Sequence, residues 1–249
     1  MRYYPGILLP GYILSVTNFT PSSPFSIPDI HTVDIWKIPL NTTSSDISAL
    51  LSILSAEELE RHRQMHERVR MPYLLSHSAC RNILSLYLKI SPAQIQYKKS
   101  THGKPFLSPA NTLRFNMSHS NTLAVIAVSN LSEVGVDIEF SDKNTDWEKV
   151  SKRFFSAEEV QYLFKQNKAD QKKVFFQLWT RKEAYIKALG TGLATSLSSF
   201  NVTAPRITTE PSALNSEASW YQKDLKIHSQ YAAAVVLNTQ INKIRYHSY

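Results

Sequence analysis

The sequence contains a single cysteine, Cys80, so no disulfide can form within the chain. Such sparse cysteine is typical of reducing compartments, and we expect a cytoplasmic protein. No apolar run approaches the roughly 20 residues that a membrane-spanning helix needs. The N-terminal stretch MRYYPGILLPGYIL is interrupted by proline and glycine, which disfavours a signal peptide. We therefore expect no membrane contact.

Several common functional motifs are also missing. A single cysteine rules out a Cys-x-x-Cys zinc motif. Neither a P-loop nor a Gly-x-Gly-x-x-Gly string occurs, which excludes the usual nucleotide-binding folds. Cys80 falls within a predicted amphipathic helix, so we interpret it as a small core residue and not as a nucleophile.

The composition is that of a globular protein, with 43% hydrophobic and 19% charged residues over 249 positions. The formal net charge of +8 predicts an anionic partner, such as a phosphate-rich cofactor or an acidic protein. The basic excess is spread over both halves of the chain and forms no basic tail. This distribution disfavours a nucleic-acid-binding arm, and we expect no nucleic-acid partner.

The sequence repeats itself at an offset of about one hundred residues. Three short strings recur in the same order, at offsets of 103, 101 and 109: residues 33–35 and 136–138, residues 55–58 and 156–159, and residues 119–128 and 228–237. Any one recurrence could be chance. Three in the same order indicate two copies of one structural unit.

Each copy has the same predicted elements. A β-branched strand comes first (32–38; 133–140), and then a Ser-x-x-Glu capping box starts a helix (Ser55 and Glu58; Ser156 and Glu159). A longer amphipathic helix (73–89; 172–189) and a further strand (123–128; 232–237) complete the unit.

This pattern predicts an α+β pseudo-dimer of two similar lobes in one monomer. We assign residues 1–130 to the N-terminal lobe, with residues 1–30 as an irregular extension, and 131–249 to the C-terminal lobe. The join falls near Ser129–Ser132, and residues 203–217 are expected to form a loop.

Two acids lie on one strand of the second lobe. Asp137 and Glu139 are two residues apart, so their side chains point to the same face of the strand. With Glu183 on the long helix, they could form an oxygen-rich site for a hard cation such as magnesium. Alternatively, the strand acids line the solvent-facing side of a sheet. Of the first-lobe counterparts, Asp34, Trp36 and Asn82, only one is an acid, so a three-acid site would belong to the second lobe alone.

The long helix of the second lobe carries Trp179, Glu183 and Lys187 along one stripe. A lysine beside an apolar face could reach a phosphate as a point charge. The alternative is an aromatic core stripe with an ordinary Glu–Lys surface pair one turn apart.

Two further segments offer groups that could contact a phosphate. Ser118 and His119 lie just before the predicted strand 123–128, and Lys104 lies in a His-Gly-Lys-Pro turn. The hydroxyl and imidazole groups could equally cap a turn, and a loop lysine is usually solvated.

The order of these motifs resembles the 4'-phosphopantetheinyl transferases of the surfactin-synthetase-activating (Sfp) type. The resemblance rests on five segments and extends from about Leu54 to Phe200; the segments are Gly103–Pro105, Asn116–Ser120, Gly135–Glu139, Phe154–Ser156 and Trp179–Gly190. That family is a pseudo-dimer with its active site at the lobe interface, which agrees with the internal repeat.

The resemblance implies an activity. A transferase of this type moves the 4'-phosphopantetheine arm of coenzyme A to a serine of an apo acyl or peptidyl carrier protein. The products are the holo-carrier and adenosine 3',5'-bisphosphate, the reaction of a holo-[acyl-carrier-protein] synthase. We expect Mg²⁺ as cofactor, coenzyme A as substrate and a monomeric enzyme.

The resemblance also implies roles for individual residues. Asp137, Glu139 and Glu183 would bind magnesium, and Glu183 is a candidate general base for the carrier serine. Lys187 would assist the departing adenosine 3',5'-bisphosphate. Lys104, Ser118 and His119 would contact the phosphates or the adenine of coenzyme A.

In one place the chain departs from the family pattern. Members often carry a His-Arg pair before the first long helix, where it binds the 3'-phosphate of coenzyme A, but here Pro72 falls near the expected arginine. A shifted helix start could let Arg70 or Arg68 substitute, since proline is tolerated in a first turn. Arg81 is a further candidate.

Two alternative functions remain open at this point. The chain could be a non-catalytic module that binds a carrier protein or nucleic acid, or a magnesium-dependent phosphohydrolase that uses the same acids. A binding module would tolerate the loss of Asp137, whereas a hydrolase would need no acceptor protein.

Overall fold

The computed structural model describes residues 25–41, 46–209 and 219–249. Most of the predicted extension at 1–30 and residues 210–217 of the predicted loop lie outside these ranges. No helix in the described ranges has both the length and the apolar character needed to cross a bilayer.

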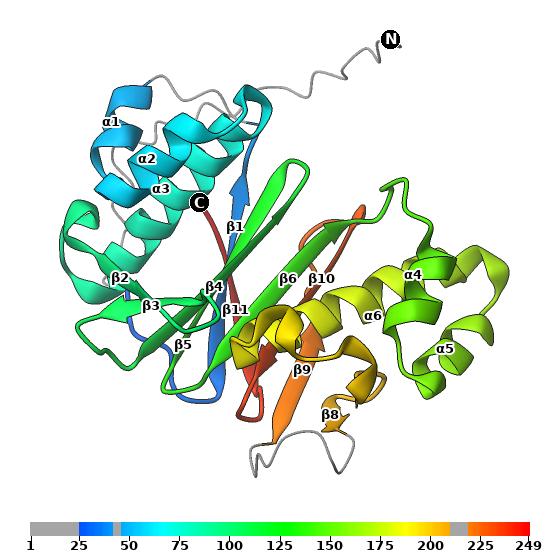
Figure 1. Cartoon of the computed structure of the whole chain (residues 1–249). Coiled ribbons are helices and arrows are strands. Elements are labelled where there is room, and N and C mark those ends of the chain that lie inside the picture. The colour runs from blue at the N-terminus through cyan, green and yellow to red at the C-terminus, as the bar shows by residue number, and fades with distance from the viewer. Residues whose placement is uncertain (1–24, 42–45, 210–218) are drawn as a thin grey trace.

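The first part of the chain forms a four-stranded sheet covered by helices, with a small two-stranded hairpin beside it (Figure 1). Its elements are β1 (Thr32–Pro39), α1 (Ile47–Ser52), α2 (Ala56–Gln64), α3 (Glu67–Leu88), η1 (Pro92–Gln94), β2 (Gln96–Lys99), β3 (Pro105–Ser108), β4 (Leu113–Ser120) and β5 (Leu123–Asn130).

The second part forms a five-stranded sheet, across which the long helix α6 lies (Figure 1). Its elements are β6 (Val134–Phe140), α4 (Trp147–Phe154), α5 (Ala157–Phe164), α6 (Lys168–Leu189), η2 (Gly192–Ala194), η3 (Leu197–Ser199), β7 (Phe200–Asn201), β8 (Arg206–Thr209), β9 (Trp220–Asp224), β10 (Tyr231–Leu237) and β11 (Lys243–Ser248).

The two sheets share a common core topology. The strand order β1-β5-β4 in the first sheet corresponds to β6-β10-β9 in the second. Both predicted capping boxes are present, since Ser55 and Ser156 each accept from the amide three residues on and each N-cap amide donates to the glutamate at that position. The predicted α+β pseudo-dimer is therefore confirmed by the arrangement of elements.

The last strand crosses from the second half of the chain to the first. β11 pairs in parallel with β1, with Lys243 opposite Thr32 and Ser248 opposite Lys37. The first sheet therefore has the order β11-β1-β5-β4. A division of the chain at residue 130 does not capture this strand, because its hydrogen-bonding partner belongs to the first lobe.

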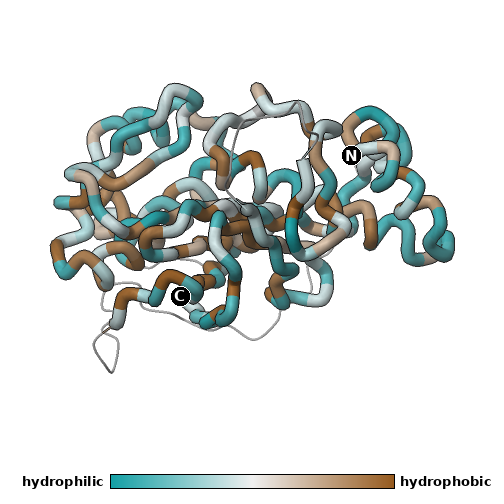
Figure 2. The backbone as a smooth tube through the Cα atoms, turned by 90° about the horizontal axis from the view of Figure 1, so that it is seen from below, coloured by the Kyte–Doolittle hydropathy of each residue, from teal (hydrophilic) through white to brown (hydrophobic). Residues whose placement is uncertain are grey.

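Three apolar clusters hold the molecule together. One lies under α3 in the first lobe, a second lies under α6 in the second, and a third joins inward-facing residues of β1, β5, β6 and β10 between the sheets. In the view from below, hydrophobic segments run through the middle of the molecule, and some also reach its left and lower edges (Figure 2). Because the third cluster contains residues of both lobes, burial of apolar surface fixes the lobes against each other.

Two predicted boundaries were wrong, and one alternative interpretation does not hold. Helix α3 begins at Glu67 and not at Tyr73, so Pro72 lies inside it, where a proline removes only one backbone hydrogen bond. Residues 116–120 belong to strand β4, whose backbone pairs with β5, and do not form a turn. Part of the predicted loop 203–217 is strand β8, which pairs with β9.

Candidate active site

Helix α6 approaches strand β6 very closely at Gly135. A Cβ atom at this position would lie 2.0 Å from the carbonyl oxygen of Ala184 and 2.4 Å from the amide nitrogen of Ala188. Only glycine permits this approach, because any side chain would push the helix away. The contact brings the part of α6 that carries Glu183 and Lys187 over the acidic end of β6.

The strand alternation along β6 separates core residues from acids. Val136 and Ile138 point into the cluster between the sheets, so Asp137 and Glu139 share the opposite face, towards α6. Asp137 has an exposed fraction of only 4%. It does not line a solvent-facing side of the sheet, which was the alternative interpretation of this strand.

Strand β4 of the first lobe lies alongside β6 and binds it through alternate side chains. The Asn116 side-chain oxygen accepts from the amide of Val136 at 2.9 Å. The Ser118 hydroxyl donates to Asp137 Oδ1 at 2.7 Å, and the Ser120 hydroxyl donates to Glu139 Oε2 at 2.8 Å. The two strand acids therefore lie at the contact between the lobes, each held by a first-lobe serine.

Each strand acid also has a lysine partner. Lys187 Nζ donates to Asp137 Oδ1 at 2.6 Å and to the Ser118 hydroxyl at 2.8 Å. Lys143, four residues beyond Glu139, donates to Glu139 Oε2 at 2.5 Å. Lys187 thus pairs across to the strand and not with Glu183 on its own helix, so the alternative of a simple Glu–Lys surface pair does not describe it.

Asp137 and Glu183 have perturbed affinities for protons. Burial raises the pKa of Asp137, although Lys187 and the Ser118 hydroxyl oppose the effect. Burial and the nearby charge of Asp137 raise the pKa of Glu183. Both groups therefore hold their negative charge in a place that disfavours it, which is typical of a site that binds a positive ligand.

The chemistry of the cluster fits a hard divalent cation. Asp137 Oδ2 is buried and has no hydrogen-bond partner among the described residues. Within the same ranges, no three acidic, histidine or cysteine side chains already converge as a formed metal centre. Instead, the two lysines bond to Asp137 and Glu139. A divalent ion bound by these carboxylates would take the place of the ammonium groups.

His119 lies at the end of β4, beside this cluster. Burial and the positive charge of Lys187 lower the pKa of its imidazole, and Glu139 partly offsets them. The side chain nevertheless keeps an exposed edge. A neutral imidazole at this place can donate one hydrogen bond to a phosphate oxygen.

The structure places Lys104 in a bridge between the lobes. Its ammonium donates to Glu133 Oε2 at 2.9 Å and to the carbonyl oxygen of Ala188 at 2.7 Å. It also lines a pocket of about 470 Å³, together with apolar residues of β3 and β4 and the end of α6. Lys104 is therefore a lobe-bridging residue that faces a pocket, and not the solvated loop lysine of the alternative interpretation.

Two of the three arginine candidates for the 3'-phosphate of coenzyme A, Arg70 and Arg81, are engaged elsewhere. Arg70 lies in the first turn of α3, and its guanidinium donates to the carbonyl oxygen of Met65 at 3.0 Å. Arg81 is 1% exposed and is bonded to Glu58 and to the carbonyl oxygens of Pro92 and Ile95. The residues around Asp137 described above are called the Asp137 cluster: Ser118, Ser120, Asp137, Glu139, Lys143, Glu183 and Lys187. Within the described residues, neither arginine bonds to this cluster.

Several residues of this region were not predicted from the sequence. Asn116 and Ser120 stand two residues either side of Ser118, so the period of a strand could have revealed them. Lys143 has no such signal, because it follows the strand in a turn.

Lys182 and Glu159 form a fully buried ion pair at 2.6 Å, and burial lowers the pKa of Lys182 to about 8. Lys182 also donates to the carbonyl oxygens of Leu197 and Phe200, so it ties the segment after α6 back to the helix.

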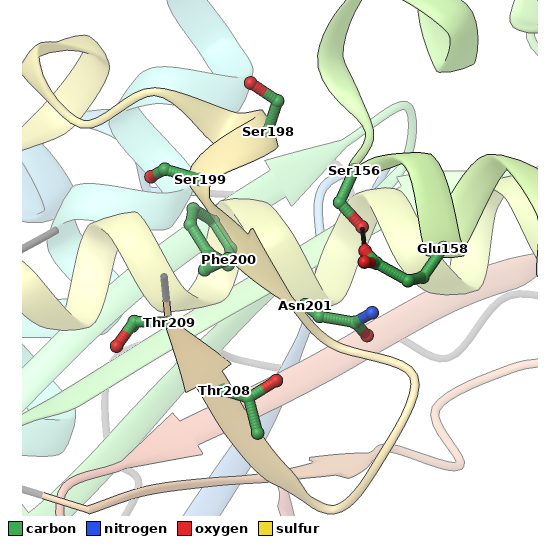
Figure 3. Close-up of a pocket in the computed structure, with 8 residues that line it drawn as sticks. All are labelled: Ser156, Glu158, Ser198, Ser199, Phe200, Asn201, Thr208 and Thr209. Carbon is green, nitrogen blue, oxygen red and sulfur yellow. Dashed lines mark hydrogen bonds between the residues drawn. The ribbon is translucent and has the colours of Figure 1, made fainter. Parts of the chain in front are cut away.

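A second pocket, of about 310 Å³, lies at the start of α5 and contains none of the predicted site residues. Figure 3 shows the Ser156–Glu158 hydrogen bond at its edge, with hydroxyl groups of η3 and β8 around Phe200. It is a polar depression in the second lobe and not a part of the Asp137 cluster.

Comparison with known proteins bears on both halves of the chain. The family described as 4'-phosphopantetheinyl transferase superfamily matches residues 133–236. The family described as 4'-phosphopantetheinyl transferase, N-terminal, matches residues 39–131. The 4'-phosphopantetheinyl transferase HetI of Nostoc sp. is 33% identical over 209 residues, which cover 82% of this chain and 87% of the relative. The chain belongs to the 4'-phosphopantetheinyl transferase family.

Other relatives agree with this assignment. The 4'-phosphopantetheinyl transferase Sfp of Bacillus subtilis is 32% identical over 153 residues, which cover 61% of this transferase and 67% of the relative. The L-aminoadipate-semialdehyde dehydrogenase-phosphopantetheinyl transferase of Candida glabrata is 28% identical, with 62% of each chain covered. The resemblance to the Sfp type is therefore confirmed, and the alternative of a non-catalytic binding module is not supported.

Proposed function

We propose that this transferase moves the 4'-phosphopantetheine arm of coenzyme A to a carrier-protein serine at the Asp137 cluster, with magnesium as its cofactor. The observation that carries the proposal is the buried oxygen Asp137 Oδ2, which has no partner among the described residues. A buried carboxylate oxygen without a hydrogen bond is costly, and a bound cation would remove that cost.

Asp137, Glu139 and Glu183 would hold the metal. When bound, magnesium supplies the positive charge that holds the pyrophosphate of coenzyme A and stabilises negative charge on its oxygens. The serines of β4 support this role, because Ser118 and Ser120 orient the carboxylates of Asp137 and Glu139.

The side chains of α6 have distinct tasks in the reaction. The serine oxygen of the carrier forms a bond to the phosphorus that bears pantetheine, and the bond from that phosphorus to adenosine 3',5'-bisphosphate breaks. Glu183 accepts the serine proton as the general base. Lys187 now donates hydrogen bonds to Asp137 and Ser118. In the reaction it donates instead to the oxygens of the leaving group.

The remaining contacts to coenzyme A follow from the same placement. Ser118 and His119 lie at the cluster and would bind the phosphates. Lys104 faces the 470 Å³ pocket, whose apolar walls suit a base such as adenine. For the 3'-phosphate, Arg70 would have to give up its bonds to the carbonyl oxygens of Met65 at 3.0 Å and Arg63 at 3.4 Å.

The acceptor we propose is an acyl or peptidyl carrier protein in the cytoplasm, as for a holo-[acyl-carrier-protein] synthase. The basic excess of +8 supports an acidic protein partner.

Cys80 has no task in this reaction. It is buried, and burial raises the pKa of its thiol to about 12, so it is a protonated core residue and not a nucleophile.

The direct test is labelling of an apo carrier protein by a fluorescent coenzyme A analogue, with and without Mg²⁺. We expect a labelled carrier only with metal, and loss of labelling when the carrier serine is replaced by alanine. Release of phosphopantetheine to water at the same rate without the carrier would identify a phosphohydrolase instead. Equal labelling in the presence of a strong chelator would overturn the metal assignment.

A further inference from the structure

Lys143 is the one member of the Asp137 cluster for which the reaction above has no task. It lies in the turn after β6, where its amide donates to the carbonyl oxygen of Phe140 at 3.2 Å. Its ammonium returns to Glu139 Oε2 at 2.5 Å. The lysine side chain is 46% exposed and that of Glu139 is 19% exposed, so the pair lies at the mouth of the cluster.

The position of Lys143 conflicts with metal binding by Glu139. Glu139 Oε2 already accepts from both Ser120 and Lys143. A divalent cation bound to that carboxylate would stand close to the ammonium, and two positive charges at that distance repel. This repulsion favours departure of the lysine from Glu139 when a metal binds.

We infer that Lys143 competes with the divalent cation for Glu139 and changes partner, from Glu139 to the pyrophosphate, when coenzyme A binds. This inference rests on the proposed metal site. In the free enzyme the ammonium lowers the affinity for metal. The coenzyme A pyrophosphate offers the displaced ammonium a new anion, so metal and coenzyme A bind more tightly together than either binds alone.

Such coupling is reciprocal, which makes Lys143 a positioning residue with a measurable signature. Without its charge, the free enzyme should bind metal more tightly. The added tightening on coenzyme A binding should shrink, because there is no ammonium left to displace.

The experiment is a titration of the full-length enzyme with Mn²⁺, followed by the paramagnetic resonance of the unbound ion, with and without coenzyme A and without carrier protein. For Lys143→Met in the absence of coenzyme A, we expect Mn²⁺ to bind about three- to tenfold more tightly than to wild type, the range for a half-exposed charge beside a divalent ion. The ratio of the dissociation constants without and with coenzyme A should fall by a similar factor. Lys143→Arg, which keeps the charge, should resemble wild type.

The chain offers a matched control in Lys172, whose ion-pair partner Asp142 directly precedes Lys143. Lys172 pairs with Asp142 at 3.5 Å and its side chain is 40% exposed, and within the described part of the chain it has no hydrogen bond or ion pair with a residue of the cluster. Lys172→Met should therefore leave both Mn²⁺ constants unchanged. Circular dichroism and the melting temperature would confirm that each variant is folded.

Glu139→Gln separates the two ways in which the inference can fail. If Glu139→Gln weakens Mn²⁺ binding but Lys143→Met binds Mn²⁺ like wild type or more weakly, the competition is refuted and the metal site stands. If Glu139→Gln binds Mn²⁺ as wild type does, the assignment of Glu139 as a ligand is refuted, and the competition with it.

Discussion

Asp34 on β1 and Asp137 on β6 are equivalent positions of the two lobes, but their surroundings differ. Asp34 is fully buried and bonded to Arg245 at 2.5 and 2.7 Å and to the Tyr87 hydroxyl at 2.7 Å. Burial acts to raise its pKa, yet His247, Arg245 and Tyr87 outweigh burial and lower it. Asp137, held by Lys187 and Ser118, has a raised pKa and a buried oxygen without a partner among the described residues.

The difference comes from the last strand of the chain. Alternate residues from β11 onwards contact the first-lobe positions that correspond to the three proposed metal ligands. Arg245 binds Asp34, the His247 ring stacks on Trp36 at 4.6 Å, and the Tyr249 hydroxyl accepts from the Asn82 amide at 2.7 Å. Arg245, His247 and Tyr249 thus occupy the first-lobe equivalent of the proposed metal site.

The comparison shows two solutions to one electrostatic problem. A buried carboxylate must be neutralised, either by a fixed cation of the protein or by an ion from outside. The first lobe uses a guanidinium, which makes the site permanent and inert. The second lobe keeps three acids, of which Asp137 and Glu139 are paired with Lys187 and Lys143, and in the proposed site a bound metal would take the place of these lysines. Four substitutions test this contrast.

The largest expected effect is the loss of transfer in Asp137→Ala. Removal of a proposed metal ligand should lower kcat/KM by about a thousandfold or more, since the metal contributes several kcal/mol of charge stabilisation. Carrier labelling at saturating Mg²⁺ measures this. Transfer within tenfold of wild type in a folded Asp137→Ala protein would contradict the proposed site.

Lys187→Ala should have the next largest effect. A lysine that stabilises the leaving group acts mainly in the transition state, so kcat should fall by roughly a hundredfold with a smaller change in coenzyme A affinity. Single-turnover labelling and calorimetric titration of coenzyme A separate the two quantities. Normal turnover would show that the lysine only partners Asp137 in the free enzyme.

Asp34→Asn should change stability and not turnover. Loss of the charge bonded by Arg245 should lower the free energy of unfolding by about 2 kcal/mol. Because the folded-state pKa of Asp34 is lowered, its contribution is present above about pH 4, the unfolded value, and is lost as the pH falls through the folded value. Urea unfolding at several pH values measures it. A folded Asp34→Asn protein as inactive as Asp137→Asn would show that the two strands are functionally equivalent.

The smallest expected effect has the opposite sign. The folded-state pKa of Asp137 is raised, so ionisation of this group destabilises the metal-free protein as the pH rises above about 4. Asp137→Asn should therefore increase the free energy of unfolding at neutral pH by about 1 kcal/mol without metal, a common exchange of function for stability. Urea unfolding in chelator measures it, with Asp34→Asn as the matched variant. A loss of stability in both variants would remove the electrostatic contrast between the lobes.

Much of the fold was predictable because its signals are local. A capping box is recognisable from four consecutive residues, and the hydrophobic pattern of a strand or a helix is recognisable from about ten. The internal repeat in the sequence then predicted that the fold is a pseudo-dimer of two similar lobes. The helix start at Glu67 was missed because Pro72 resembles a first-turn proline, whereas the helix tolerates it one turn further in.

The parts that were not predicted depend on contacts between distant segments. Nothing in the string Lys243–Ser248 indicates that it pairs with β1, and nothing near Glu139 indicates that Lys143 returns to it. For the polar string Asn116–Ser120 the sequence left a turn and a phosphate-contacting segment as alternatives, because its strand character depends on pairing with β5 and on side-chain bonds to β6. For the site, the residue types were visible in the sequence, but their partners were not.

The crossing of β11 also has a consequence for the order in which the protein is made. Asp34 and Arg245 are separated by 211 residues, so the ion pair that neutralises Asp34 cannot form until Arg245 has left the ribosome. Chains usually fold from the N-terminus during synthesis, and contacts between distant residues form slowly. During translation, the nascent first lobe has an unpaired edge at β1 and an uncompensated carboxylate beside it. The lobe that is synthesised first is thus the last to be completed.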